Sequence, residues 1–358
     1  MKRVCLIAFC VLSLLMCHCS GAEDAVRPKV LVALGDSYTA GEGIEPYYGQ
    51  NAPMAEKCKD PDWLAHRSEN GWPGLLTLPG VEGVLAEHRG EYFFFAAASG
   101  AKTNQLFLLT EEEKEAGISA GMEKEYKREG ISGTEVLAPQ LSVFDKLDEK
   151  GLKADYVVLT IGGNDVDFKN IITLSVLGKT ASIPGDTNVG KGVSLFEQQY
   201  ETDHVREAIK RAFHDVSARA GEQATILVVG YPYPIIDVQA GGAFSRDSAA
   251  ILNEATYFFC IELINIVDEC HSQGMNICYV GVSREFEGHG AYSDDPYINP
   301  VILLAGNQDL VSPALINSAS IHPNAKGAEA IARRVQYAID RLEAGSERYI
   351  FDYFAEDE

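Results

Sequence analysis

A serine lies where a short apolar run gives way to a polar turn. Residues 30–34 are followed by Gly35, Asp36 and Ser37, and so short an apolar run is typical of a buried strand. Ligands bind at the carboxyl ends of the strands in an open parallel α/β sheet, so Ser37 would face a substrate. Gly35 gives the turn backbone freedom, and Asp36 can cap a helix that follows. The free N–H groups of that helix would point toward an oxyanion formed at the serine.

Three further blocks follow in chain order, and with the serine they carry a resemblance. They are Ser99-Gly100, Gly162-Gly163-Asn164-Asp165 and His322-Pro323. The chain resembles the SGNH hydrolases, also called the GDSL esterase and lipase family, which carry serine, glycine, asparagine and histidine in four separated blocks. The resemblance extends from Val30 to about Leu342. Within the family, the chain resembles the exported actinobacterial-type lipases and esterases. The resemblance places the four family residues at Ser37, Gly100, Asn164 and His322.

These four residues supply what acyl transfer needs, namely a nucleophile, a base and donors for an oxyanion. Ser37 Oγ would attack an ester carbonyl, and His322 would take its proton and return it to the leaving alcohol. The backbone N–H groups of Ser37 and Gly100 and the side-chain amide of Asn164 would form the oxyanion hole. No metal ion or organic cofactor enters this chemistry. His66 and His289, each in a polar loop, are the rival candidates for the base.

The histidine block departs from the family pattern in one position. The family commonly has an aspartate three residues before the histidine, and here Ala319 stands there. Some exported relatives orient the histidine with a main-chain carbonyl instead, and the carbonyl of Ala319 is the matching candidate. A carbonyl selects the tautomer but stabilises imidazolium less than a carboxylate does. Ser318, Ser320 or a carboxylate from elsewhere in the chain are alternatives.

Five short runs rich in β-branched or aromatic residues must position these blocks. Because the runs are apolar throughout and widely spaced, they favour parallel strands buried on both faces and joined by crossover helices. Apolar residues recur at helical spacing from Leu252 to Ile266 and from Ala328 to Leu342. We therefore predict a three-layer α/β/α sandwich around a five-stranded parallel sheet, the flavodoxin-like fold of the SGNH hydrolases. The predicted strands are 30–34, 92–96, 156–160, 225–229 and 277–280.

The segments between the strands are less regular. Residues 43–73 predict an ordered loop beside the site, and the Arg67-Ser68 and Trp72-Pro73 pairs in it also resemble the family. Trp63 and Trp72 could serve binding or packing. Glu111 to Arg128 is dense in Glu and Lys, which predicts a solvated helix or mobile excursion without chemistry. The apolar segments 171–177 and 297–304 could line an acyl groove or fill the core.

The amino terminus predicts export. Met1-Lys2-Arg3, an apolar run to Met16 and small residues ending at Ala22 are typical of a secretory signal covering residues 1–22. Lipoprotein processing at Cys17 is the alternative. The expected location is secreted, periplasmic or otherwise extracytoplasmic. Residues 23–358 would form a single hydrolase domain with an acidic carboxyl-terminal tail and no integral membrane span.

Net charge indicates which partners the chain disfavours, and cysteine content indicates whether disulfides are expected. The chain of 358 residues is 46% hydrophobic, which suffices for a large core, and its net charge of −22 disfavours nucleic acid. We expect a monomer. Four cysteines remain after export, and an even count in an exported chain favours disulfides. Cys270 and Cys278, which flank a predicted turn, are the disulfide candidates.

Together these patterns predict an exported serine ester hydrolase that acts on carboxylic esters or phospholipid acyl esters. Two alternatives remain from the sequence. One is an esterase for O-acetyl groups on carbohydrate or cell wall, because the same fold and residues serve that chemistry. The other is a glycan-binding relative that has lost turnover.

Overall fold

Six short strands form one parallel sheet in the computed structural model, which describes residues 26–128, 130–168, 172, 204–235, 245–302 and 316–352. The strands are β1 (Leu31–Gly35), β2 (Phe93–Phe95), β5 (Tyr156–Thr160), β6 (Thr225–Val229), β7 (Ile277–Val280) and β8 (Ile350–Phe351). Their order is β2-β1-β5-β6-β7-β8, and every neighbouring pair is parallel. In the register, Leu31 lies opposite Phe93 on one side and Tyr156 on the other.

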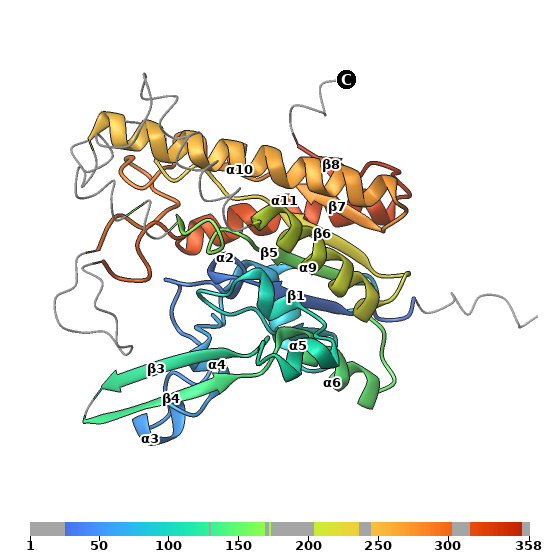
Figure 1. The fold of residues 1–358 in the computed structure, drawn as a ribbon. Coiled ribbons are helices and arrows are strands. Elements are labelled where there is room, and N and C mark those ends of the chain that lie inside the picture. Colours follow the sequence, from blue (N-terminus) through green and yellow to red (C-terminus); the bar gives the residue numbers. More distant parts are fainter. Residues whose placement is uncertain are drawn as a thin grey trace, which may run out of the picture.

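Helices cover both faces of the sheet (Figure 1). On one face lie α6 (Val143–Glu149), α9 (Val205–Ala220) and α10 (Arg246–Ser272), and on the other α11 (Ala325–Glu343). Strand β1 shows how the layers arise, since Val32 packs in the first core cluster and Ala33 in the second. The predicted three-layer α/β/α class is therefore confirmed.

All five predicted strands and both predicted helices are present. The sheet has one strand more than we predicted, because β8 spans only two residues and has no sequence signal of its own. The first five strands lie in the flavodoxin-like order, in which the chain reverses direction across the sheet between β1 and β5. Ligands bind in the crevice that forms at such a switch point. The carboxyl ends of β1 and β5 are therefore where a site is expected.

The segment from Glu111 to Arg128 is ordered, contrary to the expectation of a mobile excursion or a solvated helix. Only α5 (Glu111–Glu115) is helical, and β3 (Met122–Arg128) and β4 (Ile131–Leu137) form an antiparallel hairpin outside the main sheet (Figure 1). Tyr126 and Leu137 pack with Met54, Trp63 and neighbouring apolar residues. This packing docks the hairpin on α3 (Met54–Lys57) and α4 (Pro61–Leu64).

Short elements make up the rest of the described chain. Helix α10 is the one described helix whose length and composition would suit a membrane span. Its residues Ala255, Phe259 and Leu263 are buried against the sheet, so its apolar character belongs to the core. The other short elements are α2 (Ser37–Ala40) and the 3-10 turns η1 (Trp72–Leu75), η2 (Leu85–His88), η3 (Thr103–Leu106), η4 (Gln140–Ser142) and η6 (Ser283–Phe286).

The predicted Cys270–Cys278 disulfide is wrong. Cys58, Cys260, Cys270 and Cys278 are all buried free thiols. Cys270 packs in the core on one face of the sheet, whereas Cys278 points from β7 into the core on the other face. Because strand residues alternate between faces, the sheet itself separates the two sulfurs. Burial raises the pKa of Cys270 to about 11 and that of Cys278 to about 12, so both stay protonated and unreactive.

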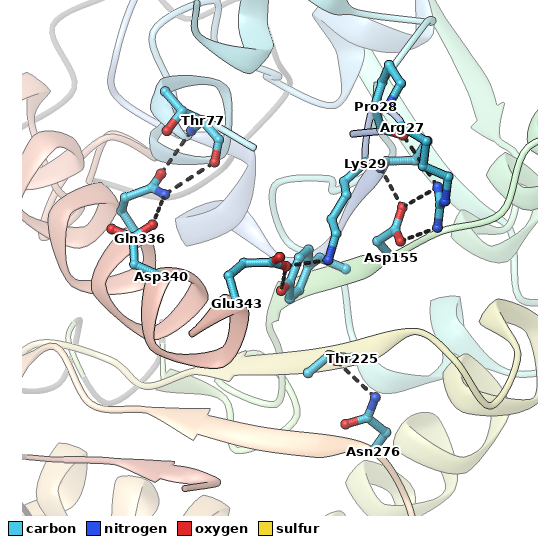
Figure 2. Close-up of polar contacts among 12 residues, drawn as sticks. Arg27, Pro28, Lys29, Thr77, Asp155, Thr225, Asn276, Gln336, Asp340 and Glu343 are labelled. Atoms are coloured by element: carbon cyan, nitrogen blue, oxygen red, sulfur yellow. Dashed lines mark hydrogen bonds and ion pairs between the residues drawn. The ribbon is translucent and has the colours of Figure 1, made fainter. Parts of the chain in front are cut away.

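Polar contacts tie the amino ends of the strands to the surrounding chain (Figure 2). Asp155 accepts hydrogen bonds from Arg27 at 2.5 Å and from the Val30 backbone at 2.9 Å. Glu343, at the end of α11, pairs with Lys29 at 2.5 Å. These contacts fix the start of β1 at the end of the sheet away from the switch point. The predicted signal segment 1–22, including Cys17, and the last six residues of the acidic tail lie outside the described residues.

Candidate active site

Ser37 is the first residue of α2, directly after β1. The Asp36 side chain caps this helix by accepting from the Tyr38 N–H at 3.0 Å, as predicted, and it also accepts from Thr160 Oγ1 at 2.6 Å and from the Tyr231 hydroxyl. Burial raises the pKa of Asp36 to about 6. Gly35 has a φ of +110°, and a Cβ there would lie 2.1 Å from the Thr160 carbonyl oxygen. Only glycine fits, so this turn holds the serine in one place.

His322 reaches the serine from the other end of the chain. Its Nε2 lies 2.7 Å from Ser37 Oγ, and its Nδ1 lies 3.0 Å from the carbonyl oxygen of Ser320. These contacts suit a ring that carries its proton on Nδ1 and accepts the serine proton at Nε2. The carbonyl that orients the ring is that of Ser320 and not the expected one of Ala319. The Ala319 carbonyl instead accepts the His322 backbone N–H at 3.3 Å, because the chain turns tightly there.

The loop that carries His322 is held on both sides. Ile321 has a φ of +61°, a strained left-handed conformation for a β-branched residue, and Tyr38 Oη donates to its carbonyl at 2.7 Å. The Tyr38 ring also packs against the imidazole, with ring centres 4.9 Å apart. On the far side Asn324 caps α11 by accepting from the Gly327 N–H at 3.1 Å, as its position before that helix predicts.

A buried carboxylate that we did not assign in the sequence lies under this loop. Glu42 is 2% exposed, accepts from Ser318 Oγ at 2.8 Å, and lies 2.6 Å from His66 Nδ1. Burial by itself would raise the pKa of Glu42, but the charge and hydrogen bond of His66 bring it well below its usual range. In the sequence, the feature that could have identified Glu42 is its position in the stretch that follows Ser37.

The pKa of His322 reflects the same surroundings. Burial lowers it below the usual value of 6.5, while the negative charge of Glu42 opposes the shift. His322 is therefore neutral at neutral pH, as a proton acceptor must be. Glu42 stands close enough to favour the imidazolium that would form when the serine proton moves to the ring.

Three donors predicted from the sequence meet on the other side of Ser37. Within the described chain, neither the Ser37 N–H nor the Gly100 N–H donates to another group. One amide hydrogen of Asn164 goes to the Ala101 carbonyl at 2.9 Å, which leaves the second hydrogen available. Asp165 reinforces this contact by accepting from Thr103 Oγ1 at 2.7 Å. All three donors line one cavity with His322.

Arg67 and the tryptophans have supporting positions. The Arg67 guanidinium donates to the carbonyls of Ala96 and Ala97 at 3.0 and 2.8 Å, just before the Ser99-Gly100 block. Trp63 and Trp72 are both buried, and the Trp72 indole N–H donates to the Tyr38 carbonyl at 3.0 Å. Packing is therefore the role that the structure gives to Trp72, whereas Trp63 is buried in an apolar cluster and also lines the cavity beside Ser37.

The rival histidines are not placed to act on Ser37. His66 contacts Glu42 and stacks on the Tyr47 ring with centres 4.7 Å apart. His289 stacks on Tyr297 at 3.8 Å, and its Nδ1 lies 2.7 Å from the Asp295 carbonyl. Of the three candidates for the base, only His322 contacts the serine.

The cavity beside Ser37 has a volume of about 1020 Å³. We expected the apolar segments 171–177 and 297–304 to form either an acyl groove or core. Ile172 from the first segment and Ile302 from the second line the cavity. Most of residues 171–177 and the last two of 297–304 lie outside the described residues. Phe168, Phe259 and Ile316 add further apolar wall, and Lys124, Glu42 and Glu45 add charge. The space is large enough for a substrate well beyond the size of an acetyl group.

The arrangement of a serine at a switch point of a parallel sheet, a neutral imidazole on its oxygen and free donors beside it suits the hydrolysis of an ester. Comparison with known proteins agrees. The chain belongs to the GDSL-like Lipase/Acylhydrolase family, whose model matches residues 31–335. It is therefore an ester-bond hydrolase.

Two Streptomyces proteins are similar to most of the chain. A lipase of Streptomyces rimosus is 28% identical over 317 residues, which cover 86% of this chain and 87% of the lipase. The crystal structure of the extracellular lipase from that organism covers 89% of this chain and all of its own, with a TM-score of 0.52 at 21% identity. Phospholipase A1 of Streptomyces albidoflavus NA297 also covers 89% of this chain and all of its own, with a TM-score of 0.52 at 19% identity. The two structures share the fold.

Proposed function

We propose that the protein is an exported serine ester hydrolase that cleaves carboxylic esters through a covalent acyl-enzyme. The observation that carries this proposal is the 2.7 Å contact between His322 Nε2 and Ser37 Oγ at the wall of the cavity. The neutral state of the imidazole and the unused donors beside the serine support it. Export rests on the predicted signal segment 1–22 and is supported by the extracellular S. rimosus lipase.

In the first half-reaction, Ser37 Oγ forms a bond to the ester carbonyl carbon while its proton moves to His322 Nε2. The carbonyl oxygen becomes an oxyanion, which the N–H groups of Ser37 and Gly100 and the Asn164 amide stabilise. The ester C–O bond then breaks, and the leaving oxygen takes the proton from the imidazolium. The alcohol departs and the acyl group remains on the serine.

In the second half-reaction, a water molecule attacks the acyl-enzyme and gives one proton to His322 Nε2. The same donors stabilise the second oxyanion. Its collapse breaks the bond to Ser37 Oγ, which regains the proton from the ring, and the carboxylic acid leaves. Throughout, the Ser320 carbonyl holds the Nδ1 proton and keeps Nε2 directed at the serine.

The favoured substrates are esters of medium or long acyl chains, including phospholipid acyl esters. Support comes from the volume of the cavity and from its apolar wall of Phe168, Ile172 and Phe259. The lipase and phospholipase names of the two Streptomyces proteins point the same way. Sugar O-acetyl esters and glycan binding without turnover are the alternative outcomes of the test.

The test measures hydrolysis of p-nitrophenyl esters from acetyl to palmitoyl by the wild-type protein and by Ser37→Ala. We expect Ser37-dependent turnover with a preference for chains longer than acetyl, because a short acyl group leaves most of the cavity unfilled. A preference for acetyl would favour the sugar esterase instead. Glycan binding that survives Ser37→Ala, without turnover by either protein, would favour the binding relative.

A covalent probe tests the nucleophile and base separately from substrate preference. A fluorophosphonate should label the wild-type protein on the peptide that contains Ser37, and His322→Ala should slow labelling by at least about 100-fold, as expected for loss of a general base. His289→Ala is the matched control, since that ring lies on Tyr297 away from the serine. Equal labelling of the two histidine variants would contradict the assigned base.

A further inference from the structure

Strand β3 of the hairpin carries a buried lysine. Lys124 is 8% exposed, whereas Glu123, Glu125 and Lys127 on the same strand are exposed. Alternation along the strand places Lys124 on the same face as Tyr126, which packs in the apolar cluster beneath the hairpin. A buried ammonium is costly unless it has a partner, so its contacts should show what it is for.

Among the described residues, Lys124 has one hydrogen-bond partner, and that partner is a backbone oxygen. Its Nζ donates to the carbonyl of Ser99 at 2.5 Å. That carbonyl belongs to the peptide unit whose N–H is that of Gly100, and the bond between them is trans, since the one cis bond among the described residues is Glu45-Pro46. In a trans peptide, C=O and N–H point in opposite directions. The ammonium therefore lies at the carbonyl edge of this peptide, and the unused Gly100 N–H points away from the opposite edge.

The surroundings keep this arrangement in place. The Ser99 N–H donates to the Ala65 carbonyl at 2.9 Å, so the loop is held from its other side as well. The charged and titratable groups that act on Lys124 are Glu42, which attracts its charge, and Arg67, which opposes it. His66 is paired with Glu42. The hairpin itself is fixed by the packing of Tyr126 and Leu137.

We propose that Lys124 is a positioning residue of the oxyanion hole, whose ammonium orients and polarises the Ser99–Gly100 peptide so that the Gly100 N–H becomes a stronger donor. The inference rests on the proposed function above. A positive charge at the carbonyl oxygen draws electron density toward that oxygen and makes the N–H more acidic. The N–H then interacts more strongly with an oxyanion than with the ester carbonyl, which is the difference that lowers the barrier.

The titration of the lysine gives this role a signature. Burial lowers the pKa of Lys124 to about 8, with Arg67 adding to the shift and Glu42 opposing it. The ammonium is present below that pH and is lost as the pH rises through about 8. Turnover should therefore fall on the alkaline side of neutral, although His322 is neutral there and still able to act as a base.

The experiment compares Lys124→Met with Lys127→Met, which removes the same charge from an exposed position of the same strand. We expect kcat for a p-nitrophenyl ester to fall by about 10-fold in Lys124→Met, less than the 10²–10³ that follows loss of a whole donor. KM should stay within about 2-fold, and Lys127→Met should match the wild type. Lys124→Arg keeps its charge at all accessible pH values, so its kcat should lack the fall near pH 8.

The outcomes separate this inference from the proposed function. If the wild type has no Ser37-dependent turnover, both are wrong. If the wild type turns over and Lys124→Met matches Lys127→Met, only the role of Lys124 is overturned. A loss in Lys124→Met that lies wholly in KM would also overturn it. If Lys124→Met does not fold, the pH profiles decide, because a wild-type profile that is flat through pH 8, or one that Lys124→Arg reproduces unchanged, contradicts the inference.

Discussion

The two sides of Ser37 are supported by buried charges of opposite sign. On the histidine side, Glu42 accepts from Ser318 at 2.8 Å in the loop that carries His322. On the oxyanion side, Lys124 donates to Ser99 at 2.5 Å in the loop that carries Gly100. Both side chains line the cavity, and no hydrogen bond joins either of them to Ser37 or His322 among the described residues. The charge of Glu42 favours the imidazolium that would form on one side, and the charge of Lys124 would support a negative oxyanion on the other.

The two sides differ in how firmly their charge is held. His66 keeps Glu42 ionised over the whole working pH range, since the pKa of that carboxyl lies far below neutral. Lys124 has no carboxylate in direct contact among the described residues, and its pKa of about 8 lies near the working range. Alkaline pH should therefore weaken the oxyanion side first, whereas acid pH should act on His322 itself.

The largest effect should come from removing an oxyanion donor outright. Asn164→Ala takes away the side-chain donor, and kcat should fall by about 10²–10³, or about 2.7–4 kcal/mol of transition-state stabilisation. The measurement is steady-state kinetics on the preferred p-nitrophenyl ester. Asn70→Ala, in a loop outside the cavity, is the control. A fall of less than 3-fold would mean that the second amide hydrogen of Asn164 does not meet the oxyanion.

Removing the charge on the histidine side should have a smaller effect. Glu42→Gln keeps the shape and can still accept from Ser318, but it loses the charge that favours imidazolium. We expect kcat to fall by about 10-fold, equivalent to about 1.4 kcal/mol. Because Glu42 raises the pKa of His322, its loss should lower that pKa further and move the acid limb of kcat/KM to lower pH.

Glu69→Gln is the matched control for this variant, because Glu69 is an exposed carboxylate outside the cavity. It should leave both the rate and the acid limb unchanged. Thermal unfolding of Glu42→Gln accompanies the kinetics, since breaking a buried charged pair also costs stability. An acid limb that stays in place in a folded Glu42→Gln protein would show that Glu42 does not act on the histidine.

A neutral contact should matter less than either charge. Tyr38→Phe removes the hydroxyl that donates to the Ile321 carbonyl at 2.7 Å but keeps the ring against the imidazole. Loss of one hydrogen bond should lower the free energy of unfolding by about 1 kcal/mol and kcat by about 3-fold. Denaturant unfolding and steady-state kinetics measure the two effects. A loss of kcat as large as that of Glu42→Gln would show that this neutral hydrogen bond matters as much as the charge of Glu42.

The smallest effect should follow changes at the sulfurs. The four described cysteines are buried free thiols, and none of them lines the cavity. A thiol reductant should therefore leave activity and the melting temperature unchanged, and titration of the denatured exported chain with a thiol reagent should find four reactive groups. Fewer groups in a fully exported chain would reveal a disulfide that the structure does not contain.

Much of the fold and most of the site could be predicted from sequence because each depends on local signals. The strands that carry Ser37, Gly100 and Asn164 are continuous apolar runs, and the turns after them are marked by glycine. The features that escaped prediction depend on tertiary contacts. Nothing local distinguishes the carbonyl of Ser320 from that of Ala319, because a left-handed Ile321 decides which of them faces the ring.

The hairpin is a second feature that depends on tertiary contacts and was not predicted from local signals. Its Glu and Lys content matches a solvated helix, yet Met122, Lys124 and Tyr126 share one face of a strand once it pairs with β4. An alternation of period two was the readable signal, and the charge density concealed it. The disulfide prediction failed for a related reason, since spacing along the chain does not reveal on which face of the sheet a cysteine lies.

The separation of Ser37 from its base has a consequence for the making of the protein. The two residues are 285 positions apart in the chain, so a ribosome completes the serine, the sheet edge and the oxyanion loop long before it adds the histidine. A growing chain that has not reached residue 322 holds Ser37 without its proposed base. Hydrolysis by the proposed mechanism therefore cannot begin until residue 322 has been added and the loop that carries it has folded against the serine.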